Sequence, residues 1–404
     1  MRNSLSEALS DTPVVILQGA RQVGKSTLAN QLAADRPSVV VTLDDPGVLA
    51  VAESDPAYFV SQARDGMLVI DEAQRAPGLI LPLKAAVDRD RRPGKFLLTG
   101  SADVLQVKGV GDSLAGRAEA FELQPLSQGE LQHRPVPEDF VSWLLSEPVL
   151  GEFDPLDPDV VVRGGYPEVQ TRSPRRARDW FASYAGRLSD HDARELHGGG
   201  YADHLQALLA ILAMGGQQEI VRARVARELG IAENTVDAYL RTAHTMRLLA
   251  AVPPWGRNLR ARVARRPKTS LNDTGFAAAL TGFTEAQALS LGGREYYGVL
   301  VEQFVTAQLH AQRGWSDQAY RIYHYRETDG LEVDVVLELA DGRLVAIEVK
   351  SASEVVPKAW RNLERFRERF AEREVVGVCF HAGPRAWRVR GWLNLLPVTS
   401  LWQH

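Results

Sequence analysis

A glycine-rich loop near the start of the chain constrains the fold most. Residues 14–18, VVILQ, are apolar and branched as in a buried strand, and the letters GARQVGKST follow them directly. Gly19 is separated by four residues from Gly24, which is followed by Lys25 and Ser26. Glycines let backbone N–H groups curl around phosphates, and a helix that begins there directs its positive end at them. The pattern predicts a strand, a phosphate-binding loop and a helix, with a purely structural turn as the alternative.

The loop and one hydroxyl beyond it form the expected nucleotide contacts. Lys25 is expected to reach the β- and γ-phosphates and to act in catalysis, and Ser26 is expected to hold Mg²⁺. Thr99 and Ser101 follow a later apolar run, so their hydroxyls either sense the γ-phosphate or cap the next helix. Arg21 contacts either phosphate or a neighbouring acid. The expected nucleotide-binding residues are Gly19, Ala20, Arg21, Gln22, Val23, Gly24, Lys25, Ser26, Thr27 and Ser101.

Two adjacent acids end another apolar run, MLVIDEAQ. Ligands gather at the carboxyl ends of the strands in open α/β sheets, and Asp71 and Glu72 stand at such an end. Asp71 is expected to complete the Mg²⁺ shell, and Glu72 to orient or activate the attacking water. A solvated strand end is the alternative. Together with the lysine loop, the two acids predict hydrolysis of the nucleotide.

Five apolar runs alternate with longer helical patterns between residues 13 and 123. This alternation predicts a parallel α/β sheet with helical crossovers. Arg117 stands behind a glycine just before the last of these runs, and a guanidinium there is a candidate arginine finger, in cis or across a subunit boundary. The runs are PVVILQ, VVVTL, MLVI, KFLLTG and AEAFEL.

The middle of the chain predicts a helix-turn-helix. Residues 205–252 hold three helical patterns with short breaks, Gly230 lies at the turn, and Val236, Leu240 and Ala243 repeat at helical spacing. Upstream, His191 and His197 have metal-ligand side chains, but their spacing sets them on different helix faces and favours packing.

A basic stretch, WGRNLRARVARRPK, follows these helices and carries six basic residues between Arg257 and Lys268. In a winged helix this stretch is the wing, and its charge suits a DNA backbone without base specificity. Packing within the protein or plain solvation is the alternative. Residues 172–178, RSPRRAR, form a second and weaker patch.

The last part of the chain predicts a metal-dependent nuclease-like site. Residues 294–312 predict an amphipathic helix that carries Glu302, and residues 331–350 predict two strands joined by an ADG hairpin turn. The strands carry Asp334, then Glu348 and Lys350, and alternation places the last two on one face. Glu302, Asp334 and Glu348 are expected to gather Mg²⁺, which polarises a phosphodiester and generates hydroxide, with Glu348 counted as catalytic as well. Lys350 either positions the attacking water or stabilises the charge that forms. Ordinary polar alternation on an edge strand gives the same letters.

Several of these motifs together resemble one family. The segments GARQVGKSTL, VIDEAQRAP, LLTGSAD, LAGRAEAFELQPLS and RGGYPE are similar to bacterial AAA-type ATPases whose C-terminal half is a domain of unknown function. The resemblance implies an AAA-like core, ATP as the nucleotide and a C-terminal PD-(D/E)xK nuclease fold of the restriction-endonuclease type. It also implies a homo-oligomer, because in such ATPases a finger from one subunit completes the site of the next.

Length and composition set the remaining limits. At 404 residues the chain is expected to form several α/β and helical domains. A net charge of -4 excludes a uniformly basic nucleic-acid coat, and the absence of a leader or a long apolar stretch predicts a cytoplasmic protein without a membrane anchor. The single cysteine, Cys379, lies in an apolar run and is expected to be a buried small hydrophobe. The expected domains are 1–130 (AAA-like), 131–204 (helical connection), 205–272 (winged helix) and 273–404 (PD-(D/E)xK-like).

Three functions remain open at this stage. The first is Mg²⁺-dependent ATP hydrolysis coupled to DNA engagement, with DNA cleavage by the C-terminal domain. The second is an ATP-switched binding or regulatory module whose nuclease-like domain does not cut. The third is an ATPase that acts on a protein partner, with the basic stretch packed against the protein itself.

Overall fold

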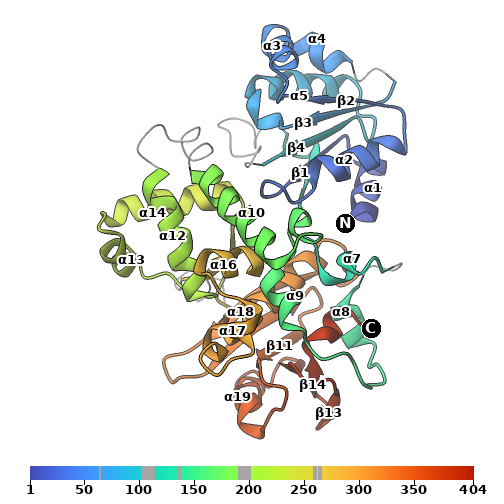
Figure 1. Ribbon diagram of the computed structural model, residues 1–404. Helices are drawn as coiled ribbons and strands as arrows, with labels where there is room; N and C mark the ends of the chain where they lie inside the picture. The colour runs from blue at the N-terminus through green and yellow to red at the C-terminus, as the bar shows by residue number, and fades with distance from the viewer. Residues whose placement is uncertain (63–64, 102–113, 135–137, 190–201, 258–261, 263–265) are drawn as a thin grey trace. The chain divides into compact units, whose positions relative to one another are not determined.

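The computed structural model describes residues 1–62, 65–101, 114–134, 138–189, 202–257, 262 and 266–404 (Figure 1). These residues form two compact units, Met1–Gln124 with Thr245–Arg247, and Pro125–His244 with Leu248–His404. His191 and His197, discussed above as alternative metal ligands, lie outside the described residues. Of the helices in the described ranges, none is both long enough and apolar enough to cross a membrane.

The first unit is built on the predicted parallel sheet. Its strands lie in the order β2-β3-β4-β1-β5, and each neighbouring pair is parallel. Each strand begins and ends within about one residue of an apolar run. The interior strands β1, β3 and β4 are buried as such runs predict, whereas the edge strands β2 and β5 are partly exposed. The strands are β1 (Val14–Gln18), β2 (Ser38–Thr42), β3 (Met67–Asp71), β4 (Phe96–Gly100) and β5 (Ala118–Glu122).

Helices cover both faces of this sheet (Figure 1). Ile16, Ile70 and Leu98 project to one face, where they pack with Phe59 and Leu83 from helices of that side. Since β1 lies between β4 and β5, the chain leaves the carboxyl end of an interior strand, and ligands bind at the carboxyl ends of strands in open α/β folds. The helices are α1 (Arg2–Asp11), α2 (Lys25–Ala34), α3 (Pro46–Ser54), α4 (Pro56–Ser61) and α5 (Ile80–Arg89), with the short 3-10 helices η1 (Ala73–Arg75) and η2 (Pro77–Leu79).

The second unit contains a helical part that leads into a small sheet. Residues Val236, Leu240 and Ala243 are buried as their helical spacing predicts, and Gly230 ends α13 in the left-handed conformation with a φ of 66°. Three antiparallel strands in the order β6-β8-β7 accompany these helices; β6 lies between α12 and α13, and β7 and β8 follow α14. The elements are α12 (Ala202–Gly215), β6 (Gln218–Glu219), α13 (Arg222–Leu229), α14 (Glu233–Thr245), β7 (Leu249–Val252) and β8 (Lys268–Leu271).

The RGGYPE segment is fixed against the start of a later helix, α16 (Thr274–Thr281). Asp273 caps this helix by accepting the Phe276 N–H, and its other oxygen accepts the Gly165 N–H, both at 2.7 Å. A Cβ atom on Gly164 would lie 2.4 Å from the Asp273 carboxylate, and one on Gly275 would lie 2.0 Å from a backbone oxygen. The glycines are therefore required for the close approach of the two segments.

Further helices of the second unit surround these segments. They include α7 (Gln128–Leu131), α8 (Phe140–Leu145), α9 (Pro158–Arg163), η4 (Pro167–Val169), α10 (Pro174–Arg187) and α17 (Glu285–Ala288). Phe181 and Tyr184 of α10 contact the ring of Phe276, which connects α10 to α16.

A six-stranded mixed sheet forms the rest of the second unit, in the order β13-β14-β12-β11-β10-β9. The predicted hairpin is present as β10 (Glu332–Leu339) and β11 (Leu344–Val349), which pair antiparallel across Gly342 with a φ of 90°. The remaining strands are β9 (Tyr320–Arg326), β12 (Val375–His381), β13 (Trp387–Val389) and β14 (Leu393–Pro397).

Two helices pack on this sheet. The helix α18 (Arg294–Gln312) buries its predicted stripe of Tyr297, Leu300, Val301, Phe304, Val305 and Leu309. The second, α19 (Arg361–Arg369), follows the 3-10 helix η6 (Pro357–Trp360) and packs Leu363 and Phe366 into the core. Cys379 lies fully buried in β12, as expected for a small apolar side chain, and burial raises the pKa of its thiol to about 12. The chain closes with the 3-10 helix η7 (Val398–Leu401).

Candidate nucleotide and carboxylate sites

The phosphate-binding loop has the backbone that its glycines predict. Gly24 adopts a φ of 101° and caps α2, and Gln22 is also left-handed with a φ of 66°. A Cβ atom on Gly19 would lie only 2.5 Å from the carbonyl oxygen of Leu123, so the loop leaves β1 without room for a side chain. Ala20 and Val23 are buried beneath the loop, whereas Arg21, Gln22 and Thr27 are exposed. The geometry leaves the N-terminus of α2 open to an anion.

Lys25 is folded back onto its own loop. Its Nζ donates to the carbonyl oxygens of Ala20 at 2.8 Å and Gly19 at 3.1 Å. Burial lowers the pKa of Lys25, although the carboxylates of Glu72 and Asp71 act in the opposite direction. Carbonyl and phosphate oxygens are both hydrogen-bond acceptors. The ammonium can therefore exchange its bonds to the loop carbonyls for stronger bonds to charged phosphate oxygens.

Asp71 and Ser26 meet at the carboxyl edge of the sheet. The Ser26 hydroxyl is 3.0 and 2.9 Å from the two Asp71 oxygens, and Thr99 from the neighbouring strand donates to the same carboxylate. A hydroxyl and a carboxylate are oxygen donors of the type that Mg²⁺ prefers. These residues, 45 positions apart in the chain, therefore fit a magnesium ion bound beside phosphates.

Glu72 is held by a small polar network. Its carboxylate accepts hydrogen bonds from Gln74 and from Ser101, the latter at 3.1 Å, while its backbone N–H donates to the Thr99 hydroxyl at 3.3 Å. Glu72 also has a left-handed backbone with a φ of 56°, uncommon for a residue with a long side chain. Gln74 was not singled out from the sequence, although it lies only two residues beyond Glu72. Ser101, one of the expected nucleotide contacts, thus holds the acid in this structure.

Arg117 lies at the opposite edge of the sheet from the loop. It directly precedes β5, whose first residue pairs with Val14 at the beginning of β1, whereas the phosphate-binding loop follows the end of β1. Its guanidinium donates to Asp88 at 2.7 Å and to the Ala115 carbonyl at 3.1 Å. The prediction that Arg117 acts in cis is therefore wrong, because parallel strands separate their two ends by their full length. Action on a neighbouring subunit stays a prediction.

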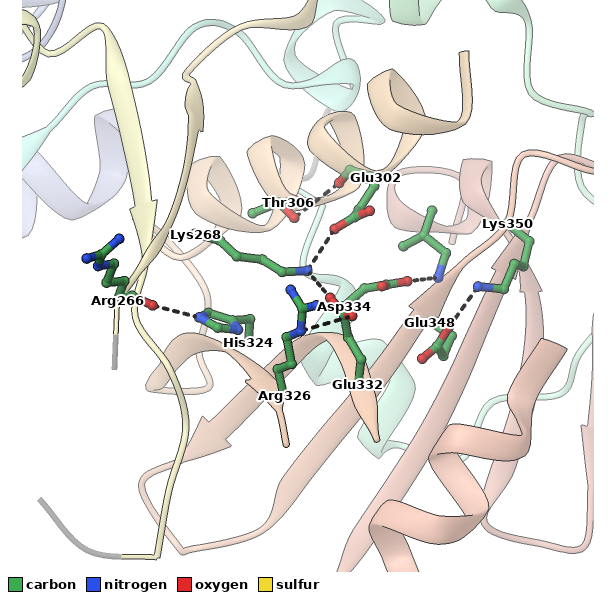
Figure 2. Close-up of polar contacts among 11 residues, drawn as sticks. Arg266, Lys268, Glu302, Thr306, His324, Arg326, Glu332, Asp334, Glu348 and Lys350 are labelled. Carbon is green, nitrogen blue, oxygen red and sulfur yellow. Dashed lines mark hydrogen bonds and ion pairs between the residues drawn. The ribbon is translucent and has the colours of Figure 1, made fainter. Parts of the chain in front are cut away.

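In the second unit the predicted nuclease-like residues lie on neighbouring elements (Figure 2). Lys350 Nζ donates to Glu348 at 2.8 Å, as expected for two residues on one face, and Asp334 accepts the backbone N–H of Val349 at 2.9 Å. Burial raises the pKa of Glu348 to about 8, with the Asp334 carboxylate adding to the shift and Lys350 opposing it. Burial likewise raises the pKa of Glu302 on α18 to about 7, and Asp334 again adds to it.

A second lysine, Lys268, enters this group (Figure 2). It lies on β8, only 5% exposed, and its Nζ is 3.0 Å from Glu332 and 3.4 Å from Glu302. Sequence reasoning assigned Lys268 to a solvent-facing wing and did not consider Glu332, which stands two residues before Asp334 on β10. The only sequence signal for Glu332 was its spacing of two residues from Asp334, which sets both acids on the same face of the strand.

The carboxylates of this group do not form a metal centre as they are arranged. Throughout the described ranges, no three His, Cys, Asp or Glu side chains are grouped so that they could hold a metal ion. Glu302 and Glu332 instead share the ammonium of Lys268, and Glu348 is bound to Lys350. The expected ligands Glu302, Asp334 and Glu348 therefore do not fit a divalent ion while these ion pairs persist.

Part of the basic stretch between Arg257 and Lys268 is paired as well. Arg257 forms an ion pair with Glu372 at 3.1 Å, and Arg262 binds both oxygens of Glu338 at 2.8 Å. The rest of the stretch, residues 258–261 and 263–265, lies outside the described residues. In the weaker patch, Arg172 and Arg176 pair with acids one helical turn away. At these described positions the basic side chains are therefore paired with acids of the same chain.

The sheet, loop and acids of the first unit define a P-loop domain of the AAA class. Residues 11–132 match the family described as AAA domain, and residues 158–287 and 297–401 match two domains of unknown function, DUF8612 and DUF4143. The chain is 31% identical over 350 residues to the uncharacterized protein Rv2008c of Mycobacterium tuberculosis, a match that covers 86% of this chain and 73% of the relative. Mb2031c of Mycobacterium bovis matches with the same values. The chain belongs to the family of these mycobacterial proteins.

Solved structures with similarity to the chain are more distant. A Walker-type ATPase of Pyrococcus abyssi shows 15% identity and a TM-score of 0.42, with 69% of this chain and 94% of that chain covered. The AMPPCP-bound DnaA from Aquifex aeolicus shows 13% identity and a TM-score of 0.29, with 59% and 85% covered.

Proposed function

We propose that the first unit binds and hydrolyses ATP. The observation that carries the proposal is the convergence of Lys25, Ser26, Asp71 and Glu72 at the carboxyl edge of a parallel sheet, around the open N-terminus of α2. Backbone N–H groups of the loop donate hydrogen bonds to the phosphates. Lys25 replaces its hydrogen bonds to the loop carbonyls by bonds to β- and γ-phosphate oxygens. When bound, Mg²⁺ at Ser26 and Asp71 supplies charge neutralisation to the phosphates.

Glu72 is proposed to position the attacking water. Its hydrogen bonds to Gln74 and Ser101 fix the carboxylate while leaving acceptor capacity for one water proton. Ser101 is thereby placed to link the state of Glu72 to the γ-phosphate, in agreement with its expected role at the end of β4.

Replacement of Glu72 tests this assignment. E72Q keeps the size and the contacts but weakens the acceptor, so we expect ATP binding to persist while the hydrolysis rate falls by about 100-fold or more. K25A is expected to lose binding as well. E119Q, an exposed acid of β5, is the matched control and is expected to hydrolyse ATP as the wild type does. Unchanged turnover in E72Q would remove Glu72 from the mechanism.

For the second unit we propose engagement of nucleic acid, most simply DNA, by the winged-helix arrangement of α12–α14 and β6–β8. The support is the sequence pattern together with the helix order and the three-stranded sheet. The ion pairs of Arg257, Arg262 and Lys268 argue against a strongly charged wing, so few phosphate contacts and a shallow dependence on salt are expected. Fluorescence anisotropy of labelled duplex DNA at increasing salt measures this slope, and a lack of binding at low salt contradicts the proposal.

The C-terminal sheet has two candidate functions, metal-dependent cleavage of DNA and binding without cleavage. The ion pairs that occupy Glu302, Glu332 and Glu348 favour the second. Incubation of linear and single-stranded DNA with the protein and Mg²⁺ or Mn²⁺, with and without ATP, distinguishes the two. Cleavage that disappears in D334A would establish the nuclease, whereas intact DNA with ATP hydrolysis retained supports an ATP-driven binding protein. We also propose a homo-oligomer, in which Arg117 of one subunit acts at the nucleotide site of a neighbouring subunit.

A further inference from the structure

We propose that the ammonium of Lys268 is the resident cation of the carboxylate cluster formed by Glu302, Glu332 and Asp334, so that a divalent metal ion binds there only by competing with Lys268. The inference concerns the C-terminal cluster and does not depend on ATP hydrolysis. It assigns to this cluster a cation that the chain itself supplies.

The geometry around Lys268 resembles that of a bound cation. Its Nζ lies 3.0 Å from an oxygen of Glu332 and 3.4 Å from an oxygen of Glu302, and these acids come from a strand and a helix that are separate elements (Figure 2). The side chain is 6% exposed, so water contributes little to the neutralisation of the two carboxylates. A buried ammonium needs acceptors that compensate the loss of its hydration, and for Lys268 two carboxylates supply them.

The electrostatics of the neighbouring groups agree with this geometry. Although burial lowers the pKa of Lys268, the carboxylates of Glu302, Asp334 and Glu332 raise it above its ordinary value overall. Arg326 at 3.8 Å also faces Glu332, and Lys350 faces Glu348. With Glu348 added, four acidic side chains of this region face three basic ones, namely Lys268, Arg326 and Lys350. Little net negative charge is left to attract a divalent ion.

The lysine comes from outside the carboxylate-bearing sheet. Lys268 begins β8, whose backbone pairs with β6 and β7, while Glu332 and Asp334 belong to β10 and Glu302 to α18. The element that neutralises the cluster is therefore part of the small sheet that follows α14. Withdrawal of β8 would expose the carboxylates, so the contact acts as a built-in block of metal binding.

Binding of Mn²⁺ to the full-length protein without nucleotide tests the proposal, with the free ion followed by its electron paramagnetic resonance signal. K268M has a side chain of similar length without charge. We expect it to bind one Mn²⁺ at the carboxylate cluster at least about tenfold more tightly than the wild type binds Mn²⁺ there. The double variant K268M/D334N should lose this ion again, which separates the cluster from any Mn²⁺ at the phosphate-binding loop. K268R keeps a cation and should bind no better than the wild type.

Three results would overturn the proposal. They are equal Mn²⁺ binding by K268M and the wild type, a gain in K268R equal to that in K268M, or a wild-type Mn²⁺ site that D334N removes and that is already filled at about 10 μM free Mn²⁺, where the ammonium of Lys268 is expected to exclude the ion. The last comparison does not use K268M, so it decides the question even when that variant fails to give the tryptophan fluorescence of the folded protein.

Discussion

Asp273 predicts a specific pH dependence for the stability of the second unit. Burial raises the pKa of this carboxyl to about 6, against the opposing hydrogen bonds from the Gly165, Phe276 and Gly275 N–H groups. Tyr166, which interacts electrostatically with Asp273, is fully buried with its own pKa raised by burial, so it stays neutral in this pH range. Since the folded pKa lies above the unfolded value, the folded state binds the proton more tightly, and stability falls as the pH rises.

The magnitude follows from the difference between the two pKa values. A shift of about 2 units from the unfolded value of about 3.9 corresponds to about 3 kcal/mol in full. About 2 kcal/mol of this is lost between about pH 4.5 and about pH 7.5, because the unfolded carboxyl is already largely ionised at the lower value. D273N has nearly the same shape but does not titrate, so its stability relative to the wild type should rise by about 2 kcal/mol over this interval.

The tryptophans allow the measurement on the second unit alone. The chain has eight of them, and none lies in the first unit, so urea unfolding followed by tryptophan fluorescence reports only on the unit that contains Asp273. Glu302 and Glu348 also have raised pKa values and give the wild type a slope of the same sign. Their effect cancels in the difference between the two proteins. The tryptophans are Trp143, Trp180, Trp255, Trp315, Trp360, Trp387, Trp392 and Trp402.

A second substitution separates titration from the loss of a helix cap. Asp157 caps α9 at the surface by accepting the Asp159 N–H at 2.9 Å, so D157N changes a cap of the same chemistry in an exposed position. We expect D157N and the wild type to show parallel pH profiles. Parallel profiles for D273N as well would refute the reasoning, because they would mean that Asp273 titrates alike in the folded and unfolded states.

Two further predictions concern a glycine and an arginine. G275A places a Cβ atom 2.0 Å from a backbone oxygen and should destabilise the second unit by about 3 kcal/mol in the same urea assay, whereas G186A, in α10 with open space around it, should stabilise it by about 0.5 kcal/mol. Equal effects would contradict the close approach. R117A should lose ATP turnover but regain part of it when mixed with K25A, because each variant supplies what the other lacks across a subunit boundary. D88A breaks the same ion pair without removing the guanidinium, so it should stay active, and a mixture without activity would exclude the finger.

Apolar runs predicted the strands of the first unit but not their places in the sheet. The run VVVTL suggests a buried strand as strongly as VVILQ does, yet β2 lies at the edge, and its Val39 and Val40 are 41% and 47% exposed. Local composition predicts that a segment forms a strand. It does not predict which strands lie beside it in the sheet, because those strands come from distant parts of the chain. The loop and its acids were predictable because their chemistry depends on local spacing.

The position of Arg117 in the sheet was predictable from the order of the elements along the chain. In a parallel sheet, residues before a strand lie at the edge opposite to residues after a strand. Arg117 precedes its strand and the phosphate-binding loop follows its own, so their separation within one chain is already implied by the order of the elements. An arginine that follows a glycine does not by itself indicate at which end of the strands its side chain lies.

Lys268 could not have been found by the same methods. Alternation relates residues of one strand, and helical spacing relates residues of one helix, so Glu348, Lys350 and the stripe of α18 were predictable. The pairs of Lys268 with Glu302 and Glu332 span 34 and 64 positions and three separate elements, and no local periodicity connects them. The same six basic residues that suggested a solvent-facing wing therefore include one that the fold buries among acids. Whether such a stretch binds phosphate or neutralises its own protein is decided by which carboxylates the tertiary structure brings to it.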